Sequence, residues 1–422
     1  MNLRFGARRA ADSASPRPRR PLRRFLAGAV AVVVVMAMLV VGISLHRASP
    51  SVDAFYEGPK AVPTGAGRLV RAEPFTRGIP DTARAWRILY TTTRADGRPA
   101  LGSGIVMLGK NAPAGPRPVL AWAHGTSGYA EVCAPSMFAQ PWGSGIRQEL
   151  GAIIRHHWLL VAPDYTGLGT PGPHPYLIGR GEGRSMLDAV RAARQLRHVS
   201  ASKHTVLWGL SQGGGVALWT RQIQPTYAPD VPLDGVTAIA PTSDMSALAR
   251  HFNDIPGGMV FMAFVLTAYS AAYPDVREQD YVTPAAQKVV KGASQRCLRT
   301  AESLVATAAS HGIGPPLLSH EPTDGALGRR LRQNTPMGTN DTPLLVAQGG
   351  ADRLVPVGVQ RAYVKALCAR GQRLDYREYP GRGHGGVARG NAPLLAQLIT
   401  WTEDRLVGEP APDNCARLGH SR

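Results

Sequence analysis

Short apolar runs alternate with longer amphipathic stretches along most of the chain. The runs lie at 119–123, 159–162, 205–210, 236–240 and 344–347. Segments with helical periodicity lie near 144–156, 183–198, 213–224, 357–370 and 391–406. Upstream, strand-like segments at 84–92 and 101–108 flank an Asp96-Gly97 turn, which predicts a β-hairpin. The pattern therefore predicts an α/β fold, with a mostly parallel central sheet and helices on both faces.

One long gap interrupts this alternation. About 100 residues separate the run that ends at 240 from the run that starts at 344. They contain helical patterns and a strongly apolar stretch at 259–272. We therefore expect an α/β domain in two parts, 81–243 and 336–422, with a helical cap inserted at 244–335. The apolar stretch favours a buried cap helix; the alternative, a lining for an apolar ligand or a lid against a lipid surface, is compatible with it.

The amino-terminal region indicates export. Residues 25–43 carry no charge, and four arginines lie between residues 19 and 24. At 1.5 Å per residue, a helix over this segment spans about 28 Å, enough to cross a bilayer core. The positive-inside rule keeps the basic tail 1–24 in the cytoplasm. We favour an uncleaved transmembrane signal anchor over a signal peptide cleaved near 52–54, which would secrete the protein. The Pro-, Gly- and Ser-rich residues 44–80 predict a linker and a loop leading into the domain.

The charge of the chain is high but uneven. The 422 residues contain 48 Lys and Arg against 29 Asp and Glu, a net charge of +19. Residues 1–24 account for +7, with eight arginines and one aspartate. The remaining +12 is dispersed, and no basic run after residue 24 is longer than two. No zinc-finger, helix-turn-helix or RNA-binding signature accompanies it, so we expect no nucleic-acid partner.

A candidate nucleophile follows one of the predicted strands. Gly209-Leu210-Ser211-Gln212-Gly213 is the only G-x-S-x-G in the chain, and it lies between strand 204–208 and a helical segment. Strand, sharp turn and helix form the setting of a nucleophile elbow. The small residues two before and two after the serine avoid clashes in that turn. Ser211 is therefore the predicted nucleophile.

A serine hydroxyl needs a base, and the base needs an acid that orients it. His384 lies in a glycine-flanked loop after the strand-like segment 374–379. Asp352 follows the run 344–347 and precedes His384 by 32 residues. The order Ser, Asp, His is that of α/β-hydrolases. Asp164 and Asp188 precede Ser211 and do not fit this order.

The reaction also needs two N–H donors for the developing oxyanion. The backbone N–H of Gln212, next to the nucleophile, is one candidate. The other is expected in the glycine-containing loop after strand 119–123, where we favour Thr126. No metal or organic cofactor is required by this chemistry.

The chain has four cysteines. Cys133, Cys297, Cys368 and Cys415 lack the spacing of metal ligands, so no metal site is predicted. An even number of cysteines in an exported chain favours disulfides. Four cysteines allow three pairings, and their spacing does not choose among them.

Several motifs resemble the secretory lipase family, the α/β-hydrolase group that includes fungal lipase A. Besides the Ser211 elbow and the Asp352 and His384 loops, the matching segments are Trp122-Ala123-His124-Gly125-Thr126-Ser127-Gly128, Cys133-Ala134-Pro135-Ser136, Pro163-Asp164-Tyr165-Thr166-Gly167-Leu168-Gly169 and Gly179-Arg180-Gly181-Glu182-Gly183. The resemblance covers about 85–415. It implies a Ser211–Asp352–His384 triad, the cap at 244–335 and disulfides Cys133–Cys297 and Cys368–Cys415. It also implies acylglycerol or other carboxylic-ester substrates.

Two departures from the family pattern limit what the resemblance implies. No acidic residue lies between Trp122 and Gly128, where fungal members can have one. Only seven residues follow Cys415, too few for the C-terminal flap of some members. Acyl-chain preference is therefore not implied, and the anchor-like N-terminus is not explained by the family.

These observations predict an exported serine ester hydrolase, a lipase or esterase that works through an acyl-enzyme. An acyltransferase or serine peptidase with the same triad is the closest alternative, because a triad does not identify the acceptor or the bond cleaved. A non-catalytic cell-envelope binding protein is the alternative from another class. The sequence does not indicate the oligomeric state.

Overall fold

The computed structural model describes residues 52–59, 61–143, 145–197, 199–255, 257–298 and 317–420, all within one compact unit, 50–422. The predicted cytoplasmic tail 1–24 and the predicted membrane segment 25–43 lie outside the described residues. Among the helices that are described, none has both the length and the apolar character needed to cross a bilayer.

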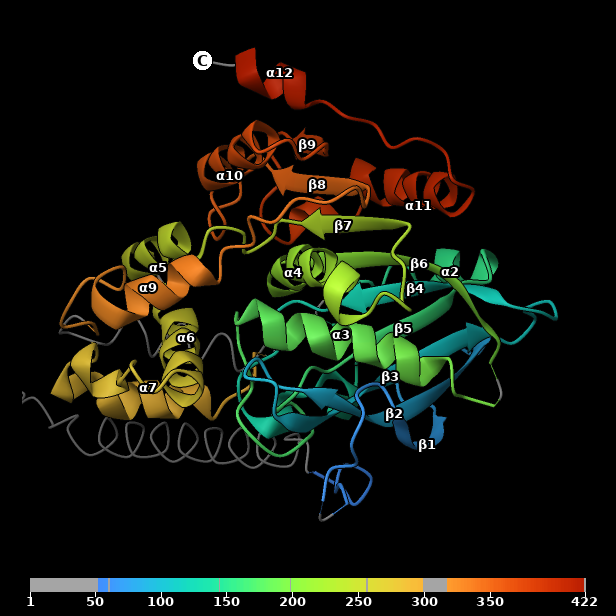
Figure 1. Cartoon of the computed structure of the whole chain (residues 1–422), viewed down its shortest axis with the longest axis horizontal. Coiled ribbons are helices and arrows are strands. Elements are labelled where there is room, and N and C mark those ends of the chain that lie inside the picture. Colours follow the sequence, from blue (N-terminus) through green and yellow to red (C-terminus); the bar gives the residue numbers. More distant parts are fainter. Residues whose placement is uncertain are drawn as a thin grey trace, which may run out of the picture. The chain divides into compact units, whose positions relative to one another are not determined.

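A nine-stranded sheet forms the centre of the unit, in the order β1-β2-β3-β5-β4-β6-β7-β8-β9 (Figure 1). The strands are β1 Leu69–Phe75, β2 Ala83–Thr93, β3 Pro99–Gly109, β4 Arg117–Ala123, β5 Leu159–Pro163, β6 Ala201–Leu210, β7 Gly235–Ile239, β8 Leu344–Gly349 and β9 Asp375–Tyr379. From β5 to β9 all neighbouring strands are parallel, and β1, β2 and β3 add an antiparallel edge. This is the predicted α/β fold class.

Helices cover both faces of the sheet. They are α2 Leu150–Arg155, α3 Gly179–Ala193, α4 Gln212–Tyr227, α10 Val357–Ala369, α11 Pro393–Leu406 and α12 Cys415–His420. Side chains of α3, α4 and α10 share one apolar cluster with Val119, Ala121 and Leu207 of the sheet. Those of α2 and α11 share a second cluster with Leu120 and Trp208. Because alternate strand residues face opposite sides, the near-continuous apolar runs fill both clusters.

The hairpin at Asp96-Gly97 is confirmed: β2 and β3 pair antiparallel along their whole length, and Gly97 has a φ of 87°. The prediction that residues 44–80 form only a linker and a loop is wrong, because β1 lies within them. β1 pairs with β2 alone, at the edge of the sheet, and most of its residues are only partly buried. Its charged residues and Pro74 hide the strand pattern, and an edge strand tolerates both.

The helix predicted at 144–156 is shorter than expected, because α2 begins at Leu150. Gly145 and Ile146 have φ values of 124° and 56°, which no α-helix contains. Gly145 also packs so closely on the Trp122 ring that a Cβ would come within 2.6 Å of it. The packing therefore forces a turn where the sequence has helical periodicity.

Between β7 and β8 the described residues are largely helical. They form α5 Met245–Asp254, α6 Gly258–Ala272, α7 Gln287–Ser294 and α9 Gly325–Gln333, with 3₁₀ turns at Glu278–Asp280 and Pro284–Ala286. These helices share an apolar cluster with residues 176–178 and Val355. Figure 1 shows them beside the sheet, at the end towards which the arrows of β7 and β8 point. Residues 299–316 of the predicted cap lie outside the described residues.

The apolar stretch 259–272 lies within α6, and its central side chains, among them Phe264, Leu266 and Tyr269, are fully buried. The buried cap helix favoured by the sequence is therefore confirmed.

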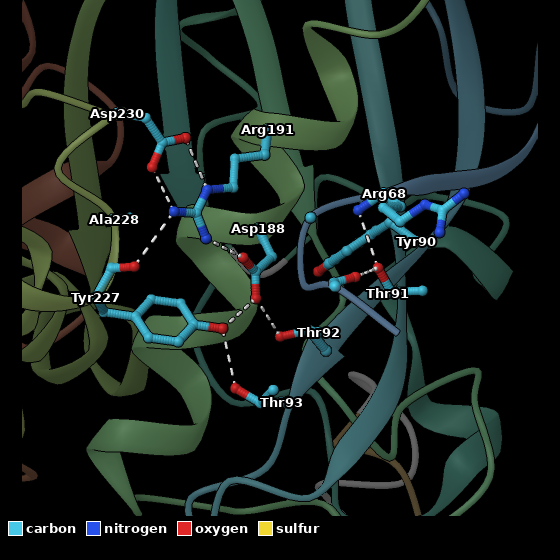
Figure 2. Close-up of polar contacts among 12 residues, drawn as sticks. Arg68, Tyr90, Thr91, Thr92, Thr93, Asp188, Arg191, Tyr227, Ala228 and Asp230 are labelled. Atoms are coloured by element: carbon cyan, nitrogen blue, oxygen red, sulfur yellow. Dashed lines mark hydrogen bonds and ion pairs between the residues drawn. The ribbon is translucent and has the colours of Figure 1, made fainter. Parts of the chain in front are cut away.

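Asp188 is one of the two acids that the chain order excluded from the triad. Its Oδ2 accepts hydrogen bonds from Thr92 and from the Tyr227 hydroxyl, both at 2.7 Å (Figure 2). Its Oδ1 accepts from Arg191 at 2.9 Å, and Arg191 also forms an ion pair with Asp230. Asp188 therefore joins β2, α3 and the end of α4, which is a structural role.

Both disulfides implied by the family resemblance are present. Cys133 is bonded to Cys297 and Cys368 to Cys415. The first joins the segment after β4 to the cap, and the second joins α10 to α12.

Candidate active site

Ser211 lies on a strained turn between β6 and α4. Its φ and ψ are 59° and −117°, outside the regions that L-residues usually occupy. Such a conformation costs about 1–3 kcal/mol and persists only where the surroundings enforce it. Here the Ser211 N–H donates to Ile239 O at 2.8 Å, and its C=O accepts from Thr242 and Gly215. The turn places the hydroxyl at the carboxyl edge of the sheet.

The glycines of the elbow are required by close backbone contacts. A Cβ on Gly209 would lie 2.0 Å from Gly213 O, and one on Gly213 would lie 1.9 Å from Ala123 O. No side chain fits at either position without moving the backbone. The predicted reason for the G-x-S-x-G pattern therefore applies to this chain.

His384 lies in the loop after β9 and reaches Ser211 from across the sheet. Its Nε2 is 2.8 Å from the Ser211 Oγ, and its Nδ1 is 2.8 Å from Asp352 Oδ2. The His384 side chain is 21% exposed, whereas the Asp352 carboxyl is fully buried. The loop approaches the end of β8 closely, since a Cβ on Gly349 would lie 2.4 Å from Arg382 O.

The Asp352 carboxylate is held by hydrogen bonds on both oxygens. Oδ1 accepts from the backbone N–H groups of Leu354 and Val355, each at 2.9 Å. Oδ2 accepts from Gln348 Nε2 at 2.9 Å in addition to His384. Gln348, a residue that the sequence reasoning missed, is the polar residue near the end of the otherwise apolar strand β8. That position is the signal that could have identified it.

The two predicted oxyanion donors lie on the expected elements. Gln212 is the first residue of α4, and Thr126 lies in the loop after β4. Within the described part of the chain, neither backbone N–H has a hydrogen-bond acceptor. The Thr126 hydroxyl is 3.1 Å from the Tyr176 hydroxyl, which joins the loop to the segment before α3.

The loop that carries Thr126 is fixed by its neighbours. The ring of His124 stacks on Tyr165 at 4.3 Å, and its two nitrogens lie within hydrogen-bond distance of the Gly125 and Asp164 carbonyls. Burial lowers the pKa of His124 to about 4, so the ring is neutral at pH 7. At the other end, Gly128 pairs with Cys297, and a Cβ on Gly128 would lie 2.6 Å from the Cys133 sulfur.

Two further buried groups that the sequence reasoning did not assign lie behind the elbow. Gln212 Nε2 is 2.5 Å from Glu182 Oε1 and 3.2 Å from His174 Nε2. Burial raises the pKa of Glu182 to about 8 and lowers the pKa of His174 to about 3. Glu182 lies in the Gly-Arg-Gly-Glu-Gly segment, whose spacing gives no sign of this contact.

A cleft of about 720 Å³ is lined by both the α/β part and the cap. Its apolar wall includes Trp219 of α4 and Ala268 near the end of α6, and its polar wall includes Arg94, Arg180 and His174. Ser211 is not among the residues that line it. α6 contributes Ala268, Ala271 and Ala272 to its lining. Among the described residues, no group of three His, Cys, Asp or Glu side chains could hold a metal ion.

A sequence model of the family described as "Secretory lipase" matches residues 149–414, more than half of the chain. The chain belongs to the secretory lipase family. Lipase 10 of Candida albicans is similar, at 25% identity over 403 residues that cover 87% of this chain and 83% of that protein. Secreted triacylglycerol lipase LIP2 of Malassezia globosa is 25% identical over 394 residues, covering 87% and 84%. Probable inactive lipase MT1628 of Mycobacterium tuberculosis is 26% identical over 400 residues, covering 87% and 85%.

Solved structures of other proteins have the same fold as this chain. Candida antarctica lipase A in its closed state aligns with a TM-score of 0.68 at 19% identity, covering 87% of this chain and 92% of that one. The rice cell wall degrading esterase LipA from Xanthomonas oryzae aligns with a TM-score of 0.61 at 22% identity, covering 82% and 97%. Together with the nine-stranded sheet, these likenesses identify the α/β-hydrolase fold that the sequence predicted.

Proposed function

We propose that this secretory lipase is a serine carboxylic-ester hydrolase whose catalytic residues are Ser211, His384 and Asp352. One observation carries the proposal: Ser211 Oγ, His384 and the Asp352 carboxylate form a continuous chain with two contacts of 2.8 Å. Nucleophile, base and orienting acid need this arrangement, whatever the fold.

The chemistry follows from the hydrogen bonds. A carboxylate only accepts, so Nδ1 of His384 carries a proton and Nε2 is free to take the proton of Ser211. The Ser211 oxygen then attacks the ester carbonyl, and the Asp352 charge stabilises the resulting imidazolium. His384 protonates the leaving alcohol, and an acyl-serine ester remains. Water, deprotonated by the same histidine, releases the acid and restores Ser211.

The oxyanion of each tetrahedral intermediate would be bound by the backbone N–H groups of Gln212 and Thr126. Both lack an acceptor within the described part of the chain, which suits donors that act only when charge develops. Gln212 also begins α4, and a helix N-terminus favours negative charge.

Family membership supports acylglycerols or other acyl esters as substrates. Relatives carry names such as "Secreted triacylglycerol lipase". The family also supports an exported protein. Attachment through residues 25–43 stays a prediction, which the mass of the native N-terminus would test.

A relative named as a probable inactive lipase supports a second candidate, a non-catalytic binding protein of the cell envelope. The connected Ser211, His384 and Asp352 contacts favour catalysis, since a binding scaffold has no need of all three. An acyltransferase or peptidase would use the same contacts, because a triad does not identify the acceptor or the bond that is cleaved.

The test is hydrolysis of p-nitrophenyl esters from C2 to C16 by the full-length chain, with Ser211→Ala as the control. We expect turnover that the variant loses by at least about 10³-fold. Inactivity on every ester, or equal activity of the variant, would refute the ester-hydrolase assignment. A C2–C8 optimum would identify an esterase, and transfer to added alcohols in preference to water would identify an acyltransferase.

A further inference from the structure

The peptide group between Ser211 and Gln212 is fixed on one side only. Its C=O accepts hydrogen bonds from the N–H groups of Thr242 at 3.2 Å and Gly215 at 3.1 Å. In a trans peptide the N–H points the opposite way from the C=O. The Gln212 N–H therefore points away from these two donors. The direction of the Gln212 N–H therefore depends on how the rest of the Gln212 residue is held.

The side chain of Gln212 is buried and donates two hydrogen bonds. Its Nε2 is 2.5 Å from Glu182 Oε1 and 3.2 Å from His174 Nε2. The His174 Nδ1 is 3.0 Å from Thr166 O, and a carbonyl only accepts, so Nδ1 carries the ring proton and Nε2 is an acceptor. The Gln212 Oε1 has no partner among the described residues. The orientation of this amide is thus set by Glu182 and His174.

We propose that Glu182 and His174 are positioning residues that hold the Gln212 side chain and thereby aim its backbone N–H at the oxyanion. The inference rests on the proposed function, because it concerns a donor of that reaction. The strained φ of Ser211 makes such support necessary. A turn in a sparsely populated conformation relaxes when its surroundings stop enforcing it. Glu182 and His174 come from the start of α3 and the loop before it, so they act through Gln212 and touch no reacting atom.

Glu182 suits this position because it is neutral at pH 7, as burial raises its pKa to about 8. A neutral carboxyl accepts the Gln212 hydrogen bond without placing a negative charge behind the oxyanion. The titratable groups that face it are His174, Tyr165, Tyr176 and Tyr269. Burial makes all four harder to ionise, so they stay neutral near pH 8. Above about pH 8 the ionised Glu182 should therefore oppose the oxyanion.

The experiment compares two substitutions of Glu182 in the full-length chain. Glu182→Met fills a similar volume but removes the acceptor, whereas Glu182→Gln keeps an acceptor and cannot ionise. Glu149 supplies the matched control, since it is also buried with a raised pKa but lies next to α2. Kinetics on one p-nitrophenyl ester are measured from pH 6 to 9.5, with thermal melting for each variant. Gln212→Ala and the Gln212→Ala/Glu182→Met double variant complete a cycle.

We expect Glu182→Met to lower kcat by about 10–50-fold with KM within about 2-fold, less than the 10²–10³ for a lost oxyanion donor. Glu149→Met should leave kcat within about 2-fold. In the Gln212→Ala background, Glu182→Met should lower kcat no further, because the Gln212 side chain that Glu182 contacts is absent. Wild-type kcat should fall above about pH 8, and Glu182→Gln should stay level there.

Three results would overturn the inference. The first is a Glu182→Met kcat equal to that of Glu149→Met, and the second is a double variant whose loss in kcat is the product of the two single losses. The third is the same fall in kcat above about pH 8 in Glu182→Gln as in the wild type. If Glu182→Met does not fold, the pH profile of Glu182→Gln decides by itself. These failures are distinct from failure of the proposed function. In that case the wild type shows no hydrolysis beyond Ser211→Ala, and the inference falls with it.

Discussion

Removing Cys133–Cys297 should lower both kcat and stability, whereas removing Cys368–Cys415 should lower only stability. Cys133–Cys297 holds the loop that carries Thr126 against the cap: Gly128 pairs with Cys297, and Leu298 N–H donates to Ser127 O at 2.8 Å. Cys368–Cys415 joins α10 to α12 instead. The perturbation is replacement of each pair by alanines. Because the first pair is part of the Thr126 loop's support, its loss should loosen one proposed oxyanion donor.

The stability costs follow from the two loop lengths. The sequence separations are 164 and 47 residues. The chain-entropy relation gives about 5 kcal/mol for the longer loop and about 4 kcal/mol for the shorter at 25 °C. A unit of roughly 370 residues has an unfolding entropy of about 0.8 kcal/mol/K. The melting temperature should therefore fall by about 6 °C without Cys133–Cys297 and by about 5 °C without Cys368–Cys415.

Nearly equal stability costs make the comparison of activity informative. The assay is kcat on a p-nitrophenyl ester at 15 °C, normalised to the active fraction by titration of Ser211 with a phosphonate. We expect the variant without Cys133–Cys297 to lose about 5–20-fold in kcat, part of the effect of a lost oxyanion donor. The variant without Cys368–Cys415 should stay within about 2-fold of the wild type. Equal kcat in the two variants, or a loss confined to the second, would refute this reasoning.

Three further predictions concern single residues. Asp352→Asn should lower kcat by about 10³–10⁴-fold with little change in KM, because an amide no longer enforces the His384 tautomer. Ester kinetics measure this loss, and a decrease in kcat below 10-fold would contradict the prediction. Gly213→Ala should prevent folding, because a Cβ there would lie 1.9 Å from Ala123 O; soluble expression with a wild-type melting temperature would contradict this. Burial raises the pKa of Glu182 to about 8 in the folded chain. Between pH 5 and pH 8 the unfolded chain therefore loses this proton while the folded chain keeps it, so the unfolding free energy of the wild type should fall relative to Glu182→Gln by roughly 1 kcal/mol per pH unit. Urea unfolding at pH 5, 6.5 and 8 measures it, and a constant difference would contradict it.

The parallel strands and the three proposed catalytic residues could be predicted because their signals are local. Apolar runs mark β4 to β8, and each of Ser211, Asp352 and His384 follows a strand in a loop rich in glycine or polar residues. Carboxyl ends of parallel strands meet at one edge of a sheet, so strand order alone brings these loops together. The 2.8 Å contacts among them fit that expectation.

Features that depend on distant packing could not be predicted. β1 exists because β2 offers it a partner, and α2 is shortened because Gly145 packs on Trp122. The contact between Glu182 and Gln212 joins α3 to α4 through two residues that are 30 positions apart in sequence, and no periodicity encodes it. The disulfide pairing likewise came from the family resemblance, since the spacing of four cysteines leaves three choices.

Covalent labelling of Ser211 tests the central claim most directly. The full-length chain is treated with a fluorophosphonate that mimics the tetrahedral intermediate, and the modified residue is located by peptide mass spectrometry. The account predicts one stoichiometric adduct on Ser211, none in Ser211→Ala, and labelling in His384→Ala slowed by at least about 10²-fold. An unlabelled Ser211 in a folded chain that hydrolyses esters, or equal labelling without His384, would contradict it.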